Sequence, residues 1–556
     1  MRGSLGVGRG AEDKPLLGRA TVSAMRWSEV EQTRVLGSFD PVALMLEFSA
    51  RYAPPDPETK DWPRYLENVP TSLIAHELTH LTQTFATAAG VRQFLLAVED
   101  LRLRSRMLMA AGSSPTEGLV LPICLNRDRY ADNDEFQDLE RAWLANRTAA
   151  RMHAGGTYQD ESDPEIALAW IDNDARLGNQ PVPWEVSHFF LQPVTGRHES
   201  VMTGYIHLTE GAAKVVERIQ RRLAKEEGEQ APLGTQSRTI QQFLSEISSP
   251  VDPYYIAQLV FWEAKFRNGR KASRPAHEEY VLLLADLAMM LDPLLTPKSF
   301  SAFYGGLEKQ HLAAALAWAS PFPIYLRLCA AFWSLGDELP DLSPTRRLTD
   351  QAVELQDALL EHCELKLTMK GITEECLSST QALSHHFDSH IYEEHANLHE
   401  AFSQGFQQAL AWRLEALRGG AVCEDLLVDR ATLLSHVRAW SPSQVIGSAI
   451  HSAFDVRPGE GVGVSQANIQ AHRAMLDNAF FGNGPCPLAE GERERRCALD
   501  PIDLCVRLPE GEPTEDEPAY CVREQFMSLL TIQGTGGWSW SPPTPQNPLA
   551  APHRAR

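Results

Sequence analysis

The sequence contains no run of eighteen apolar residues, the length at which a membrane-spanning helix is expected. Its most apolar segment, Val281–Leu295, includes Asp286 and Asp292, so we expect a buried or amphipathic helix there. The first 25 residues lack the apolar centre of a secretory signal. We therefore expect a cytoplasmic protein with no membrane partner.

Cysteine and positive charge are also scarce. Nine cysteines in 556 residues suit a reducing compartment better than a disulfide framework. Lysine and arginine number 51 against 73 aspartates and glutamates, which gives a formal net charge of -22 at pH 7. Because so acidic a surface repels phosphate backbones, we expect no nucleic-acid partner.

Several common catalytic signatures are missing as well. The sequence has no G-x-x-x-x-G-K-[ST] phosphate loop, no G-x-S-x-G nucleophile elbow and no G-x-G-x-x-G after a strand. The chemistry of this chain therefore has to come from a different motif.

Helical periodicity is the main pattern that is present. Apolar residues recur every three to four positions through much of the chain, whereas the alternation of half-buried strands is rare. We predict a mainly α fold (α+β) with a small sheet, in which Val42–Phe48 is a strand. The predicted helices are 70–90 (closed by Gly90), Phe94–Ala111, Glu135–Arg151, Thr209–Glu227, Thr239–Ile247, Tyr254–Phe266, His277–Leu291, Gln310–Trp318, Gln351–Leu367 and Gln381–Leu417.

His76, Glu77 and His80 form the motif H-E-x-x-H within the predicted helix 70–90. Residues i and i+4 lie one turn apart on the same helix face, so two imidazoles there can hold one Zn²⁺ at about 2.0–2.1 Å. Glu77 would then lie beside the open coordination position and take a proton from water. The alternative is an amphipathic helix with two surface histidines and no metal.

A third zinc ligand has to come from elsewhere in the chain. The metzincin pattern requires Gly and His where this chain has Gln83 and Ala86. The segment Leu208–Ala213 (LTEGAA) instead resembles the E-G-x-A helix start of the gluzincin metallopeptidases. That resemblance implies that Glu210 is the third ligand. The alternatives that remain open are Glu217, His207, Glu263 and His153.

The gluzincin resemblance also implies a fold. It predicts a zincin-like core with a small sheet and large helical insertions, because a long segment separates His80 from Glu210. The small residues Gly211, Ala212 and Ala213 would let their helix pack closely on the H-E-x-x-H helix. Along the chain we expect a disordered or over-called start at 1–25, a catalytic region at 26–300, a helical domain at 301–480, a Cys-containing segment at 481–541 and a disordered tail at 542–556.

Two further clusters contain residue types that bind metals. The predicted helix Gln381–Leu417 carries five histidines whose two i,i+4 pairs face different directions, so we expect a solvated or interfacial face. Four C-terminal cysteines lack a C-x₂-C knuckle, which leaves a structural zinc, free thiols and disulfides open. These residues are His385, His386, His390, His395 and His399, and Cys486, Cys497, Cys505 and Cys521. The other cysteines are expected in the core.

The motifs together predict a zinc-dependent hydrolase, most simply a peptidase that acts on a peptide or protein substrate. Zn²⁺ would polarise the scissile carbonyl, and Glu77 would pass the water proton to the leaving amine. The developing oxyanion needs one more donor, for which the candidates are Tyr205, His207, Tyr254 and Tyr255. The alternative is a non-catalytic helical scaffold with a structural or vestigial metal site. The oligomeric state stays open.

Overall fold

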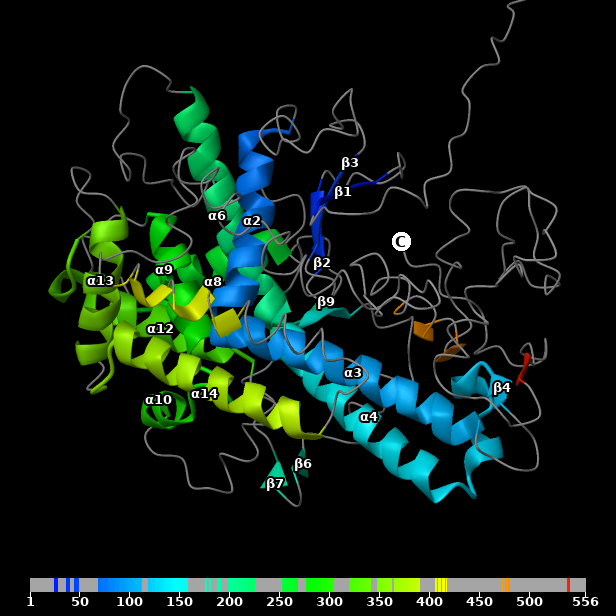
Figure 1. Cartoon of the computed structure of the whole chain (residues 1–556). Coiled ribbons are helices and arrows are strands. Elements are labelled where there is room, and N and C mark those ends of the chain that lie inside the picture. Colours follow the sequence, from blue (N-terminus) through cyan, green and yellow to red (C-terminus); the bar gives the residue numbers. More distant parts are fainter. Residues whose placement is uncertain are drawn as a thin grey trace, which may run out of the picture.

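The computed structural model of the chain is mostly helical, with short strands (Figure 1). The mainly α class predicted from the sequence is therefore confirmed. The residues that the structure describes are 25–28, 37–40, 45–49, 69–112, 119–158, 176–177, 180–181, 188–191, 199–225, 253–268, 277–304, 320–341, 348–362, 365–390 and 538–540, with short helical stretches within 406–417 and 473–480.

The helices largely follow the periodicity of the sequence. They are α2 (Thr71–Ala86), α3 (Ala88–Gly112), α4 (Asp134–Ala154), α6 (Tyr205–Lys225), α8 (Pro253–Asn268), α9 (Glu279–Met290), α10 (Pro297–Phe303), α12 (Phe322–Leu335), α13 (Leu348–His362) and α14 (Met369–His390), with 3₁₀ turns η3 (Ile123–Leu125), η4 (Arg127–Tyr130) and η6 (Gly336–Glu338). The sequence analysis did not predict α10 or α12. The predicted helices Thr239–Ile247 and Gln310–Trp318 lie outside the described residues.

The strands form small sheets. In the first, β1 (Met25–Ser28) is parallel and β2 (Gly37–Asp40) antiparallel to the central strand β3 (Met45–Ser49), which overlaps the predicted strand Val42–Phe48. This sheet lies beside α2 (Figure 1). The other strands pair as β5-β9-β8, β4-β10 and β6-β7, with bounds β4 (Leu119–Leu121), β5 (Gly156–Tyr158), β6 (Arg176–Leu177), β7 (Gln180–Pro181), β8 (His188–Leu191), β9 (Glu199–Met202) and β10 (Trp538–Trp540).

The helix that carries H-E-x-x-H ends earlier than we predicted. The sequence pattern gave one helix closed by Gly90, but α2 stops at Ala86 and Thr87 is extended, with φ -124° and ψ 151°. Thr87 Oγ1 donates to the carbonyl of Gln83 at 2.6 Å and accepts from the N–H of Gly90 at 3.1 Å, so one hydroxyl joins the two helix ends. Gly90 lies inside α3, where a Cβ would stand 2.2 Å from the Gln83 carbonyl oxygen. Its lack of a side chain allows this close approach.

Helix α6, which carries Glu210, lies between α2 and two later helices. α2 runs alongside α6, and α8 and α9 pack on α6 as well (Figure 1). We expected Gly211, Ala212 and Ala213 to let α6 pack closely on α2, and the two helices do pack on each other. The close contact of Gly211 itself is with α8, where an added Cβ would lie 2.7 Å from the Cβ of Ala257. Gln258 Nε2 donates to the Gly211 carbonyl at 3.1 Å. The small residue therefore fixes α6 against α8.

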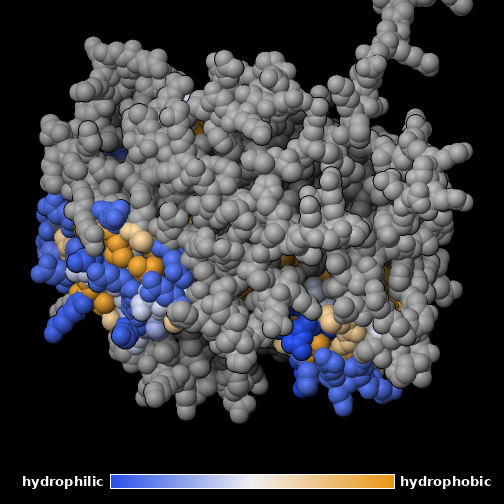
Figure 2. Space-filling view, in the orientation of Figure 1, coloured by the Kyte–Doolittle hydropathy of each residue, from blue (hydrophilic) through white to orange (hydrophobic). Residues whose placement is uncertain are grey.

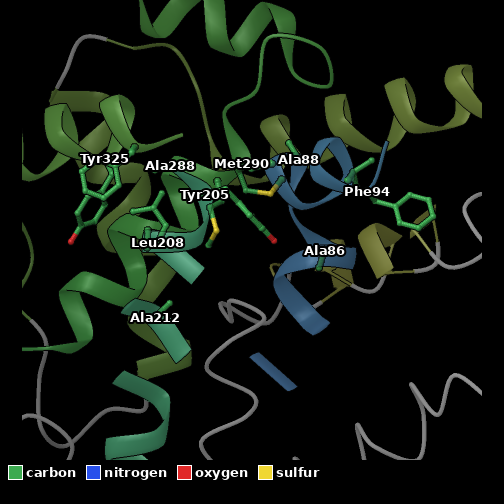
Figure 3. Packing of buried hydrophobic residues seen from close by; sticks show 14 of the residues in the cluster. Ala86, Ala88, Phe94, Tyr205, Leu208, Ala212, Ala288, Met290 and Tyr325 are labelled. Carbon is green, nitrogen blue, oxygen red and sulfur yellow. The ribbon is translucent and has the colours of Figure 1, made fainter. Parts of the chain in front are cut away.

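The hydrophobic core centres on α9. Every residue of α9 is buried, as we predicted for a helix within Val281–Leu295. Figure 3 shows Ala288 and Met290 of α9 among the buried side chains near Leu208 of α6. One hydrophobic cluster includes buried residues of both the predicted catalytic region 26–300 and the predicted helical domain 301–480. The described helices of these two regions therefore share a core.

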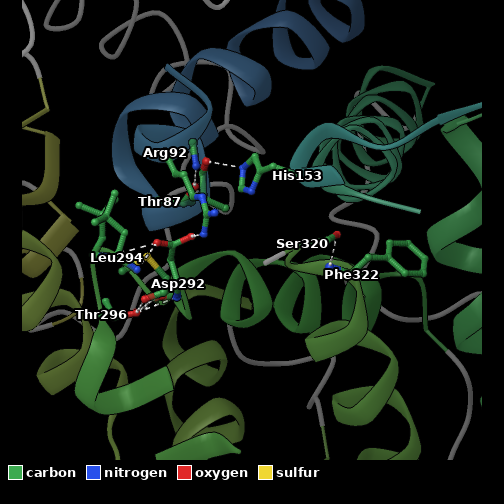
Figure 4. Close-up of polar contacts among 12 residues, drawn as sticks. Thr87, Arg92, His153, Asp292, Leu294, Thr296, Ser320 and Phe322 are labelled. Carbon is green, nitrogen blue, oxygen red and sulfur yellow. Dashed lines mark hydrogen bonds and ion pairs between the residues drawn. The ribbon is translucent and has the colours of Figure 1, made fainter. Parts of the chain in front are cut away.

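Two buried ion pairs fasten the α2–α3 junction to α9 and the turn after it. Arg92 of α3 donates to Asp292 at 3.2 Å (Figure 4). Arg413 donates to both carboxylate oxygens of Asp286, at 2.8 and 2.6 Å, and to the carbonyl of Ala86 at 3.3 Å. The end of α2 is thus held by a residue more than three hundred positions away.

Part of the described surface is visible in the space-filling view. On the face shown in Figure 2, the described areas over α13 and α14 and over α4 are mainly hydrophilic, with hydrophobic side chains between the polar ones. Within the described residues, no helix is both long and apolar enough to span a membrane. Of the cysteines expected in the core, Cys329 and Cys376 are buried free thiols and Cys124 is only partly buried. Cys363 and Cys423 lie outside the described residues.

Candidate metal centre

α2 presents His76 and His80 on one face, one turn apart. Their side chains are 7% and 11% exposed. The two Nε2 atoms lie 3.2 Å apart, and the rings meet edge to face with centroids 4.9 Å apart. Both Nε2 atoms therefore point at the same region beside α6.

Glu210 of α6 reaches that region from the opposite side. Its Oε2 lies 3.4 Å from His76 Nε2 and 3.3 Å from His80 Nε2. Among the residues that the structure describes, these three make up the group found to have ligand atoms close enough to share a metal ion. The structure thus brings together the three side chains that the two motifs single out.

The spacing of the three atoms suits a zinc ion. Ligands about 2.0–2.1 Å from a tetrahedral Zn²⁺ are about 3.3 Å from one another. The separations here are 3.2, 3.3 and 3.4 Å. Two neutral imidazoles and one carboxylate are a common set of protein ligands at catalytic zinc sites, which leave the fourth position to water or substrate.

The charges of the cluster stabilise a cation at this point. Burial disfavours ionisation of Glu210, but His80 and His76 outweigh it and hold the pKa of Glu210 well below its usual range. Burial likewise opposes a charge on His76, yet the close carboxylates of Glu210 and Glu217 raise the pKa of His76 to about 9. Without a metal, a proton on His76 therefore supplies positive charge to the cluster.

Glu217 lies against His76 without belonging to the group that could hold a metal. Its Oε2 lies 3.5 Å from His76 Nδ1, on the ring edge away from Glu210. Burial alone would raise its pKa, but His76 and Lys214 lower the pKa of Glu217 to about 2. Lys214 Nζ donates to Glu217 at 2.9 Å, and Arg221 pairs with it too. His76 Nδ1 makes no hydrogen bond of good geometry, so at this distance the carboxylate acts on the ring through its charge.

Our sequence reasoning did not identify Lys214 and Arg221 as supports of this carboxylate. Both lie on α6 at three and four positions from Glu217. Side chains at these spacings are neighbours on a helix surface, so the i,i+3 and i,i+4 rule is the signal that would have found them.

Glu77 is buried next to the ligands without being one of them. It is 3% exposed, and the metal-competent group does not include it. Burial raises the pKa of Glu77, and the charges of His80 and His76 offset this in part. Glu77 is thus a buried carboxylate with a raised pKa, next in the sequence to His76.

The alternative third ligands have other roles. His207 accepts a hydrogen bond from the N–H of Gly204 at 3.0 Å, and burial lowers its pKa to about 4. His153 contacts the Ala89 carbonyl at 2.9 Å, and Glu263 is an exposed residue of α8. None of these three belongs to the metal-competent group.

Tyr254 is the oxyanion candidate that the structure places beside the cluster. Its ring centroid is 5.6 Å from that of His76, and the residue is 36% exposed. Tyr205 instead stacks on His153 at 5.5 Å, and Arg218 lies over Tyr255. Tyr254 is thus both near the ligands and open to solvent.

The two other clusters of metal-binding residue types cannot be located in this fold. The C-terminal cysteines, His395 and His399 lie outside the described residues. The backbone of α14 extends to His390 and so includes His385 and His386. The zinc and solvated-face predictions for these segments stay predictions.

Comparison with known proteins adds no relative. No protein-family model, no curated protein and no solved structure matches the chain. The gluzincin resemblance therefore rests on the two motifs and on the geometry of the residues in them.

Proposed function

We propose that this chain is a gluzincin-like, zinc-dependent hydrolase that cleaves peptide bonds in a peptide or protein substrate. The observation that supports it most is the convergence of His76 Nε2, His80 Nε2 and Glu210 Oε2 at 3.2 to 3.4 Å, the spacing that one tetrahedral zinc needs. The intact Glu77 next to this set adds the base that hydrolysis requires.

Each residue of the site has one role in this proposal. A bound Zn²⁺ would polarise the scissile carbonyl and lower the pKa of water. Glu77 accepts the proton of the attacking water and delivers it to the leaving amine. The hydroxyl of Tyr254 donates a hydrogen bond to the developing oxyanion, and Glu217 holds the His76 ring in place.

The small sheet supports a zincin-like core and suggests how a peptide would bind. β2 is an edge strand of its sheet, and β2 and β3 both contact α2. An extended peptide can pair with an edge strand through main-chain hydrogen bonds. Binding along β2 would bring a peptide bond close to the helix that carries His76 and His80.

The alternative is a helical scaffold whose metal is structural. Such a site has no use for a buried carboxylate beside its ligands, which is why we favour the hydrolase. A chelator distinguishes the hydrolase from the scaffold. It would abolish cleavage by the hydrolase, whereas in the scaffold it would only lower stability, because a structural metal stabilises the fold without supporting hydrolysis.

A peptide-library assay tests the proposal. The purified chain is incubated with a mixture of defined peptides, and new termini are identified by mass spectrometry. We expect cleavage that a chelator abolishes, that zinc restores and that His80→Ala lacks. His362→Ala, which alters a half-exposed histidine of α13, is the matched control and should cleave normally. Zinc bound through His80 without any cleavage would favour the scaffold.

A further inference from the structure

We propose that Lys214 is a positioning residue of this site, which holds the Tyr254 ring against His76 and so places the Tyr254 hydroxyl for the developing oxyanion. The inference rests on the proposed function, in which Tyr254 is the donor and Lys214 has no part. It follows from a closed cycle of contacts among four side chains that come from three helices.

The packing of α6 on α8 brings Lys214 and Tyr254 together. The two helices meet closely at Gly211, where an added Cβ would lie 2.7 Å from the Cβ of Ala257. Lys214 lies three positions after Gly211, and Tyr254 lies three positions before Ala257. Lys214 Nζ is 5.5 Å from the centroid of the Tyr254 ring. The two contacts advance in opposite directions along the helices, which therefore run antiparallel with the lysine facing the tyrosine one turn from the close contact.

The same lysine contacts the carboxylate that lies against His76. Lys214 Nζ donates to Glu217 Oε2 at 2.9 Å, and this Oε2 atom lies 3.5 Å from His76 Nδ1. The His76 ring in turn meets the Tyr254 ring, with centroids 5.6 Å apart. The four side chains thus form a closed cycle of contacts, in which Lys214 joins both groups that lie against His76.

An ammonium group suits this position. A cation near the face of an aromatic ring is attracted to it, and the Glu217 carboxylate attracts the same ammonium. The Lys214 side chain is 20% exposed, so water screens these attractions only in part. Tyr254 is the second residue of α8 and is 36% exposed. Packing therefore restrains its ring less than that of a core residue, and a contact such as that with Lys214 matters more for its orientation.

Substitutions of Lys214 separate this role from general support of the fold. Lys214→Met keeps the length of the side chain but removes its charge and its donor, whereas Lys214→Arg keeps both. Lys370→Met is the matched control, because Lys370 is an exposed lysine of α14 that also pairs with a glutamate, Glu374, at 3.8 Å.

Fluorine NMR tests the contact without requiring zinc or hydrolysis. The chain is labelled with meta-fluorotyrosine, and the signal of Tyr254 is identified as the one that Tyr254→Phe lacks. We expect Lys214→Met to shift this signal toward its position in the unfolded chain, Lys214→Arg to shift it less, and Lys370→Met to leave it in place. An unchanged signal in Lys214→Met would overturn the inference.

Kinetics on a peptide that the chain cleaves test the role. Tyr254→Phe removes an oxyanion donor, a change that typically lowers kcat by about 10²–10³-fold. Lys214→Met displaces the hydroxyl without removing it, so we expect kcat to fall about tenfold with KM and zinc content little changed. Added to Tyr254→Phe, it should cause no further fall, because the donor is already absent. An equal fall in both backgrounds would overturn the inference.

The outcomes separate this inference from the proposed function. Failure of the natural chain to cleave any peptide would overturn the proposed function and the kinetic role of Lys214. The fluorine signal would still show whether Lys214 holds the Tyr254 ring, because that measurement needs neither a metal nor a substrate.

Discussion

Two buried carboxylates of this protein use their oxygens in different ways. Asp286 accepts hydrogen bonds from Arg413 at 2.8 and 2.6 Å and from Gln356 at 3.1 Å. Glu210 Oε2 lies against two imidazoles, yet it accepts no hydrogen bond of good geometry. Burying a charged oxygen without a hydrogen bond is costly. The carboxylate of Asp286 therefore has its hydrogen bonds within the protein, whereas Glu210 Oε2 would gain a partner from a bound cation.

The comparison teaches which changes should affect the fold and which should affect the chemistry. The Asp286 cluster joins the end of α2 to α9 and to Arg413, so its loss should destabilise the protein. The Glu210 cluster lies at the edge of the core, where Glu210 and His80 reach solvent. Its loss should remove metal and activity while the helices remain folded.

Glu77→Gln should have the largest effect and should leave the fold intact. The amide keeps the size of the side chain but cannot accept the proton, and general-base catalysis contributes about 10²–10⁴-fold. We expect hydrolysis of any cleaved peptide to fall by at least two orders of magnitude, with zinc content unchanged by mass spectrometry. Full activity in this variant would show that the H-E-x-x-H motif has no catalytic role.

Arg413→Met should instead lower stability. Removing one partner of a buried pair leaves the other charge uncompensated, which typically costs about 3–5 kcal/mol, and both side chains here are 0% exposed. Urea unfolding measures the change. Arg141→Met is the control, because it breaks an exposed pair with Asp138 and should not shift the transition. Loss of zinc from folded Arg413→Met would contradict the separation of the two clusters.

Glu217→Gln should weaken the metal site without abolishing it. The carboxylate lies 3.5 Å from His76 Nδ1, and loss of a partner that supports a metal ligand typically costs 10–100-fold in metal affinity. Competition with a zinc chelator of known affinity measures the change. Glu263→Gln, which alters an exposed glutamate of α8, should bind zinc normally. Equal affinities for the two variants would mean that Glu217 does not support the ligand.

The pH dependence of zinc binding has a definite sign. Zinc needs neutral imidazole, and the Glu210 and Glu217 carboxylates overcome burial to raise the pKa of His76 to about 9. The apparent affinity should therefore rise about tenfold per pH unit up to about pH 9. The folding stability of the metal-free chain has the opposite pH dependence. The contribution of protonated His76 to stability is fully present below pH 6.5 and is lost as pH rises through about 9. Zinc should thus raise the melting temperature more at pH 9 than at pH 6.5, and the reverse order would contradict this.

The sequence predicted the residues of the candidate site better than it predicted where the helix that carries them ends. His76 and His80 lie on one face because helix geometry fixes the i,i+4 relation, and E-G-x-A identified Glu210 across a long gap. The end of α2 could not be predicted, because Thr87 caps both helix ends and Gly90 packs against Gln83.

The buried ion pairs were equally hidden in the sequence. Arg413 and Asp286 are 127 positions apart, and nothing in the local pattern of either residue indicates a partner. Only the tertiary packing brings Arg413 to Asp286 of α9 and to the carbonyl of Ala86 at the end of α2. Local spacing therefore predicts a site built on one or two helix faces, but not a contact that the tertiary fold creates.

Zinc X-ray absorption on the purified chain and on His80→Ala tests the central claim most directly. The account predicts one zinc with nitrogen and oxygen ligands at about 2.0–2.2 Å, and its loss in folded His80→Ala. Any zinc on the C-terminal cysteines would differ, since sulfur ligands lie at about 2.3 Å. A chain with no zinc on nitrogen and oxygen ligands, or an unchanged spectrum in His80→Ala, would contradict the account.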